Sequence, residues 1–127
     1  MTTLRELAQS YGVTIVSVPL PGDLLGCYLP ERASVYVDTR LTPNEHRSVL
    51  AHELGHVHYG HSELPGGDPA AWERQADAIA ARLLIDRDEY ARLERVSDDL
   101  HFLADSLDVT VSVIEAYRTL CLPRMGR

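Results

Sequence analysis

The hydrophobic pattern up to residue 38 is typical mainly of strands, and the pattern from residue 42 onward is typical of helices. Residues 13–18 (VTIVSV) are rich in β-branched side chains and predict a strand. Residues 25–29 and 34–38 flank a proline-containing turn, which indicates a β-hairpin. A short helix is expected before them, because Thr3 and Glu6 have the spacing of a capping box. We therefore expect a small three-stranded antiparallel or mixed sheet with at least one open edge.

Four or so helices are expected in the remainder of the chain. Thr42 and Pro43 mark a helix start, and Gly60 can adopt the left-handed conformation that ends the same helix. Asp68 precedes a proline in the same way and starts a helix that extends to about residue 85. Further helix starts are indicated at Asp86, Ser97 and Thr110. This order predicts a single α+β domain over residues 1–127, with the sheet packed on helices.

Composition restricts the class of protein. Hydrophobic residues make up 45% of the 127 positions and charged residues 24%, as in ordinary soluble domains. The net charge of -7 argues against a surface built to bind phosphate backbones. No run of about 18 apolar residues predicts a membrane span, and the N-terminus does not resemble a signal peptide. Cys27 and Cys121 match no metal or redox spacing, so we expect a cytoplasmic protein with two free thiols.

The motif that carries the chemistry is H-E-x-x-H, formed by His52, Glu53 and His56 within the helix expected from residue 42. At about 100° per residue, His56 lies roughly 40° from His52 and one turn further along the same face. Two imidazoles so placed can share one zinc ion. Glu53 projects beside the metal, where a general base can take a proton from the attacking water. Leu50 and Leu54 lie on the opposite side of the helix and predict its contact with the core.

A catalytic zinc usually has three protein ligands and one open position. Glu73, 17 residues after the second histidine of the motif, is the candidate for the third ligand. Asp77 lies one turn further along the same stripe, where its carboxylate could accept the free ring N–H of a ligating histidine. Ala76 and Ala80 are small enough to let the two helices approach closely. The alternative is that Glu73 forms a solvated charge pair with Arg74.

The remaining histidines are weaker candidates for the metal. The metzincin pattern requires a glycine three residues after the second motif histidine and a further histidine three residues later. Gly60 and His61 are both displaced by one position, so the pattern fails. Surface or loop roles are expected for His58 and His61. His46 and His101 have no spacing that recommends them.

Two segments of the chain resemble the ImmA/IrrE-type metallopeptidases. They are A-H-E-L-G-H at residues 51–56 and W-E-R-Q-A-D-A-I-A-A-R-L-L at residues 72–84. The likeness extends weakly to the preceding hairpin and to residues 103–114. The resemblance implies a compact version of the thermolysin-like zincin core, with the H-E-x-x-H helix at the active site.

The same resemblance implies an activity. In that family the zinc ligands correspond to His52, His56 and Glu73, and the general base corresponds to Glu53. Characterised members include proteases that cleave helix-turn-helix repressors and thereby release genes of mobile elements, phages or stress responses. The resemblance therefore implies a Zn²⁺-dependent endopeptidase whose protein substrate is such a repressor. The oligomeric state stays open.

Several alternatives stay open at this stage. Residues 103–120 can be read as a helix-turn-helix, but the second helix offers Val111, Val113 and Ile114 where a DNA-binding helix needs polar or basic residues. We expect no direct nucleic-acid binding, and expect these helices to pack under the sheet or to face a protein partner. A zinc protein that acts on a repressor or toxin by binding alone is the other alternative. The oxyanion could be stabilised by Tyr59, His58, Arg74 or Tyr28, none of which the spacing favours.

Overall fold

The computed structural model describes residues 2–60 and 67–122, and within them an α+β fold with a three-stranded mixed sheet. The strands are β1 (Thr14–Val18), β2 (Gly26–Leu29) and β3 (Ser34–Asp38), in the spatial order β1-β3-β2. The central strand β3 pairs antiparallel with β2 and parallel with β1. The hairpin turn is a short 3-10 segment, Pro30–Arg32, closed by Ala33 in the left-handed region (φ 47°). The predicted strands and their mixed pairing are confirmed, and β2 lies at one edge of the sheet.

The helices are α1 (Leu4–Ser10), α2 (Pro43–Tyr59), α3 (Pro69–Leu84), α4 (Arg87–Glu94), α5 (Leu100–Leu107) and α6 (Val111–Ala116), with a π-helical turn after α6 (Tyr117–Cys121). The capping boxes expected at the starts of α1 and α2 are both formed, and Gly60 ends α2 in the left-handed conformation. The start expected at Ser97 is wrong by two residues. Asp99 caps α5 through the Phe102 N–H, while the Ser97 hydroxyl accepts from the Asp99 N–H. No helix in the described ranges is both long and apolar enough to cross a membrane.

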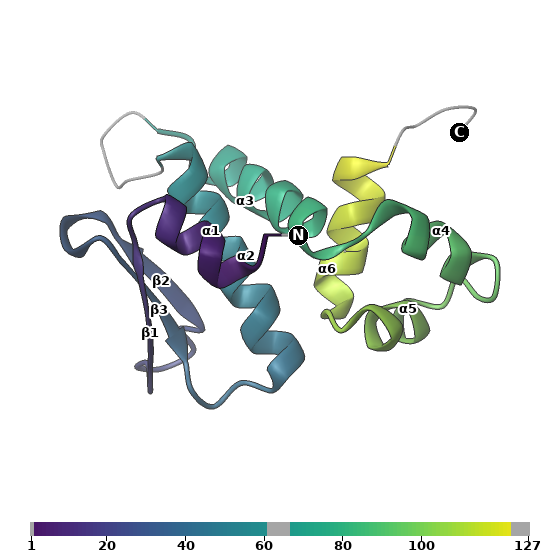
Figure 1. Ribbon diagram of the computed structural model, residues 1–127, viewed down its shortest axis with the longest axis horizontal. Helices are drawn as coiled ribbons and strands as arrows, with labels where there is room; N and C mark the ends of the chain where they lie inside the picture. The colour runs from purple at the N-terminus through teal and green to yellow at the C-terminus, as the bar shows by residue number, and fades with distance from the viewer. Residues whose placement is uncertain (1, 61–66, 123–127) are drawn as a thin grey trace.

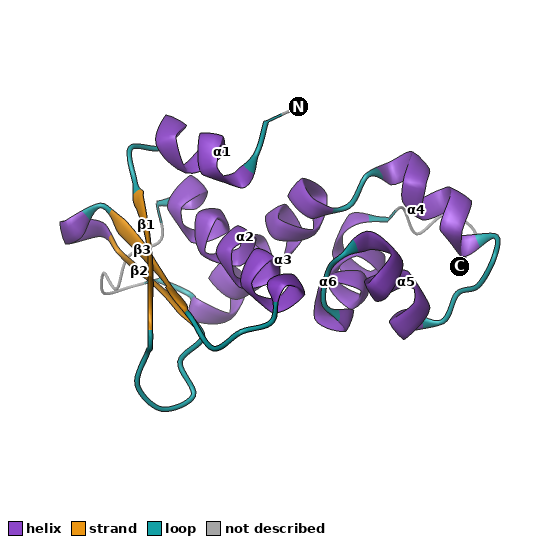
Figure 2. Ribbon diagram, turned by 60° about the horizontal axis from the view of Figure 1, so that its bottom comes forward, coloured by secondary structure: helices purple, strands orange, loops and turns teal. Residues whose placement is uncertain are grey.

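The elements are arranged in three layers, with the sheet at one end, α2 and α3 in the middle and α4–α6 at the other end (Figure 1). Helices α1 and α2 cover the same face of the sheet (Figure 2). Their shared core contains Val35 and Val37 of β3 and Leu50 and Leu54 of α2, all buried. The apolar stripe predicted on α2 therefore packs on the sheet. It holds the opposite face of α2 toward α3.

The C-terminal helices lie away from the sheet: α6 and the turn after it pack against α3, while α5 packs on α6 and α4 packs on α5. Of the two alternatives expected for them, packing under the sheet is wrong. Their buried side chains, including Leu103 and Ile114, form a second core with Ala80 and Ala81 of α3. One face of the sheet is already covered by α1 and α2. The C-terminal helices instead bury the side of α3 that carries Ala80 and Ala81.

Polar contacts fasten this C-terminal unit to α2. The Arg47 guanidinium donates to the carbonyl oxygens of Leu107 (3.3 Å) and Asp108 (2.9 Å), just before α6 begins. The Ser48 hydroxyl accepts the Thr110 N–H at 3.2 Å. The first turn of α6 is thereby held beside the middle of α2.

Candidate metal centre and active site

The candidate site forms where α2 and α3 approach each other more closely than ordinary side chains allow. Gly55 of α2 faces Ala76 of α3, and both residues are fully or almost fully buried. A Cβ atom added at Gly55 would lie 2.8 Å from Ala76 Cα and 2.9 Å from the Ala76 carbonyl oxygen. A helix-interior glycine costs roughly 1 kcal/mol relative to alanine, so its presence here indicates a contact that needs the missing side chain. The close contact places Glu73 and Asp77 of α3 opposite the histidines of α2.

The three side chains expected to be metal ligands converge at this contact. Nε2 of His52 and Nε2 of His56 lie 3.1 Å apart. The Glu73 carboxylate bridges them, with one oxygen 2.9 Å from His52 Nε2 and the other 3.2 Å from His56 Nε2. Among the described residues Glu73 forms no ion pair with Arg74, the partner considered in the sequence. The structure therefore brings together the three residues that the spacing and the family resemblance selected.

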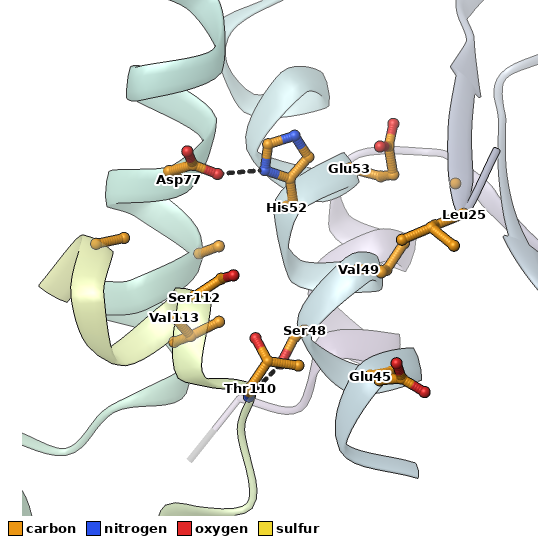
Figure 3. Close-up of a pocket in the computed structure, with 13 residues that line it drawn as sticks. Leu25, Glu45, Ser48, Val49, His52, Glu53, Asp77, Thr110, Ser112 and Val113 are labelled. Atoms are coloured by element: carbon orange, nitrogen blue, oxygen red, sulfur yellow. Dashed lines mark hydrogen bonds and ion pairs between the residues drawn. The ribbon is translucent and has the colours of Figure 1, made fainter. Parts of the chain in front are cut away.

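Asp77 fixes the orientation of the first histidine. Its carboxylate lies 2.8 Å from His52 Nδ1, so this nitrogen carries the ring proton and donates it to Asp77 (Figure 3). Nε2 of the neutral ring is then left with a lone pair directed at Glu73 and His56. Burial by itself lowers the pKa of His52, but the hydrogen bond to Asp77 and the nearby carboxylate charges outweigh burial and raise it.

The donor atoms at the centre are chemically suited to a metal cation. The Nε2 atoms of His52 and His56 and the Glu73 carboxylate face one another at 2.9–3.2 Å. Their lone pairs repel one another unless a proton or a metal ion lies between them. Ligand atoms about 2.1 Å from a tetrahedral zinc ion lie about 3.4 Å from one another, so adjustments of a few tenths of an ångström would complete the site. His52, Glu53 and His56 together form a group that can hold a metal ion. With Glu73 against both ring nitrogens, two nitrogens and one carboxylate form a ligand set that zinc uses.

Glu53 lies beside the metal-binding atoms in a different environment. It is 9% exposed, and its carboxylate oxygen lies within 4.8 Å of the ligand nitrogens of His52 and His56. Burial raises the pKa of Glu53 to about 7; the positive charge of His52 opposes the shift and the charge of Glu73 adds to it. A carboxyl with a pKa near neutrality can both take up and release a proton, as general acid–base catalysis requires.

The edge strand β2 closes the site on the side of Glu53. A Cβ atom added at Gly26 would lie 2.6 Å from Val49 Cγ1 and 3.0 Å from Glu53 Cγ. The strand can therefore lie directly against α2 because residue 26 has no side chain. Neither Gly26 nor Gly55 was selected from the sequence, although a glycine inside a helix and one opening a strand are both positions that suggest a close backbone approach.

The other polar candidates are placed away from the metal-binding atoms. His58 Nδ1 contacts the Tyr11 hydroxyl at 2.8 Å, and His46 Nε2 contacts the Ser17 hydroxyl at 3.3 Å. His61 lies outside the described residues. Among the four candidates for the oxyanion, Tyr28 packs with the core between the sheet and α2, whereas Tyr59 and Arg74 are exposed.

A cavity of about 550 Å³ opens beside the site and runs along α2 (Figure 3). His52, Glu53 and Asp77 line one end of the cavity. Thr110, the N-cap of α6, and Ser112 and Val113 within α6 form a wall beside α2. The sequence did not predict this wall, because it depends on how the C-terminal helices pack. The metal-binding atoms therefore lie next to a cavity large enough to receive side chains of another molecule.

An α+β fold that presents an H-E-x-x-H helix against a second, carboxylate-bearing helix is zincin-like. Residues 8–117 match the peptidase M78 family, described as the IrrE N-terminal-like domain. The chain belongs to this family, which confirms the resemblance identified from the two motifs and indicates a metallopeptidase.

A solved structure shows the same fold. It is a transcriptional regulator of Mycobacterium tuberculosis, similar to this chain with a TM-score of 0.67 and 21% sequence identity. The similarity covers 95% of this chain but 42% of the regulator, so this chain spans less than half the length of that protein. No curated protein sequence matches the chain.

Proposed function

We propose that the protein is a zinc-dependent endopeptidase. The observation that carries this proposal is the convergence of His52, His56 and Glu73 on one point, with the buried carboxyl of Glu53 beside them. Three ligands leave one coordination position open, and the cavity beside His52 and Glu53 gives a substrate room to approach it. A purely structural zinc site usually has four protein ligands and needs no base.

In the proposed mechanism, a zinc ion held by the two histidines and Glu73 would act as a Lewis acid on the scissile carbonyl and lower the pKa of a water molecule. Glu53 accepts the proton from the attacking water and then passes it to the leaving amine. The pKa of about 7 belongs to the metal-free site, and the charge of a bound zinc ion would lower it, which favours the carboxylate that acts as the base. Asp77 holds His52 in the tautomer whose Nε2 lone pair faces the metal-binding point.

The edge of β2 provides a binding site for an extended peptide. Leu25 accepts a hydrogen bond from the Asp38 N–H, so Leu25 and Cys27 pair with β3. The alternation of an antiparallel ladder then directs the N–H and C=O groups of Gly26 and Tyr28 toward the open edge. A substrate segment can add to this edge as a further strand, and Gly26 would hold it close to Glu53.

We further propose that the substrate is a helix-turn-helix repressor of a mobile element, a phage or a stress response, and that cleavage takes place in the cytoplasm. This step rests on the family to which the chain belongs, because the resemblance implies regulatory proteases of this kind. The solved relative is itself a transcriptional regulator, which agrees with a role in gene regulation.

The first experiment measures bound zinc by elemental analysis in the parent protein and in Glu73→Ala. We expect about one zinc ion per chain in the parent, and a loss or a large reduction in the variant, because a carboxylate ligand is removed. Arg74→Ala is the matched control, since it changes an exposed neighbour on the same helix. A parent protein that binds no zinc after zinc is supplied would exclude the peptidase mechanism.

A second experiment separates hydrolysis from binding alone. Glu53→Gln keeps the size of the side chain but removes the base, so it should retain zinc and fold while cleavage falls by about 10²–10⁴-fold. The readout is cleavage of candidate helix-turn-helix repressors followed by mass spectrometry, with zinc content measured in parallel. If the variant relieves repression as well as the parent does, the protein acts by binding and not by proteolysis.

A further inference from the structure

The cavity extends beyond the catalytic centre to a charged residue that the proposed mechanism does not use. It follows α2 from His52 toward the start of the helix, where Glu45 lines its far end (Figure 3). Glu45 precedes His52 by seven positions, which corresponds to about 10.5 Å along the helix axis. Ser48 and Val49 lie between them on the same side of the cavity.

The walls between these two ends are largely apolar. Val49 of α2 points toward Leu25 at the edge next to β2, and Val113 of α6 lies on the other side of α2 (Figure 3). Leu25 is 48% exposed, so its side chain is accessible to a ligand in the cavity. A ligand with a hydrocarbon stem would cover this apolar surface.

The charges around the cavity are acidic. Its lining contains the carboxylates of Glu45, Glu53 and Asp77 and no arginine. Glu53 and Asp77 belong to the metal centre, but Glu45 forms no ion pair among the described residues. One of its oxygens accepts the Thr42 N–H, which leaves acceptor capacity on the other. The nearest cation in sequence, Arg47, donates instead to the carbonyls ahead of α6.

From this arrangement we propose that the cavity is a specificity subsite for an arginine or lysine side chain of the substrate, with Glu45 as the residue that recognises its charge. This inference rests on the proposed peptidase function. Arginine and lysine combine a long apolar stem with a charged end, so the stem can cover Leu25 and Val49 while the cation reaches Glu45 at the open rim (Figure 3). Short or acidic side chains at this substrate position are disfavoured, because they leave the apolar walls uncovered or face three carboxylates.

The test uses two zinc-binding probes that differ only at the end of one side chain. N-acetyl-arginine hydroxamate carries a guanidinium, and N-acetyl-citrulline hydroxamate carries an uncharged urea of nearly the same shape. Their dissociation constants are measured by calorimetry on the zinc-loaded parent, on Glu45→Gln and on Glu6→Gln. Glu45→Gln removes the charge but can still complete the capping box of α2, because glutamine also serves at this position. Glu6→Gln is the matched control, because Glu6 occupies the same capping-box position in α1 and does not line the cavity.

We expect the parent and Glu6→Gln to bind the arginine probe about two- to fivefold more tightly than the citrulline probe, as for a partly exposed ion pair. The ratio should fall to about one in Glu45→Gln and should also decrease in the parent at high salt. The subsite would be overturned if the parent bound the two probes with equal affinity, or if Glu45→Gln kept the preference for the arginine probe. In either case, zinc-dependent binding of both probes would still support the metal centre. Absence of zinc-dependent binding of either probe would instead overturn the proposed function and the subsite together.

Discussion

Replacing Gly55 by alanine would test whether the close approach of α2 and α3 creates the metal centre. The added methyl group would lie 2.6 Å from Ile79 Cγ2, 2.8 Å from Ala76 Cα and 2.9 Å from the Ala76 carbonyl oxygen. The Ile79 side chain can rotate away, but the two Ala76 atoms belong to the backbone. Because carbon atoms pack at about 3.5–4.0 Å, the facing part of α3 must move away by roughly 0.6–1.2 Å.

This displacement should affect the metal site more than the stability of the fold. Glu73 and Asp77 flank Ala76 on α3, so the shift carries their carboxylates away from His52. Metal ligands need placement to within about 0.5 Å, and we expect zinc affinity to fall by at least about 10–100-fold. Overpacking costs about 1–3 kcal/mol, but the better helix propensity of alanine offsets about 1 kcal/mol. The net loss in the free energy of unfolding should therefore be about 0–2 kcal/mol.

The assay is a zinc titration against a competing chelator, with urea unfolding of the metal-free protein measured beside it. Ile79→Ala and the double variant with Gly55→Ala separate the two kinds of contact. Ile79→Ala alone should leave zinc affinity within a few-fold of the parent, and the double variant should recover little, because the contact with the Ala76 backbone remains. Parental zinc affinity in Gly55→Ala would refute the reasoning, and full recovery in the double variant would show that Ile79 alone sets the helix spacing.

Three further changes address the surroundings of the site. Asp77→Ala should lower zinc affinity about 10–100-fold by releasing the ring it orients, and an unchanged chelator titration would contradict that role. Gly26→Ala should displace Glu53 and reduce the turnover of a cleaved substrate by up to about 100-fold while zinc affinity is retained; equal loss of both would point to general disruption. Ser48→Ala should cost about 1–2 kcal/mol in urea unfolding, because the Thr110 N–H loses its acceptor, and a change within experimental error would show that water replaces it.

The sequence was most informative where a few neighbouring residues determine the structure. Thr42 and Glu45 form a capping box through contacts three residues apart, and the motif of His52 and His56 needs one helical turn. Such features depend on local geometry alone, so spacing predicts them. The contact of Asp77 with a motif histidine could also be predicted from the sequence. Asp77 lies four residues after Glu73 and therefore on the same face of α3, next to the histidines.

Features that depend on tertiary packing were missed. The C-terminal helices were expected under the sheet, but that face is occupied, and the cavity wall formed by Ser112 and Val113 follows from their packing on α3 instead. The start of α5 was placed at Ser97 because serine and aspartate are similar capping residues, and both Ser97 and Asp99 accept N–H groups here. Hydrophobic periodicity shows that a helix has a buried side but not which element covers it.

Arg47 and Ser48 tie the C-terminal helices to the helix that carries the H-E-x-x-H motif. Both residues belong to α2, the helix that carries the motif histidines, and both hold the segment that begins α6. The cavity wall formed by α6 is therefore held in place by the same helix that carries His52 and His56. The exposed side chain of Ser112 takes no part in these contacts. Under the proposed peptidase function, a substitution at Ser112 would change the surface that meets the substrate without disturbing the residues proposed to hold zinc.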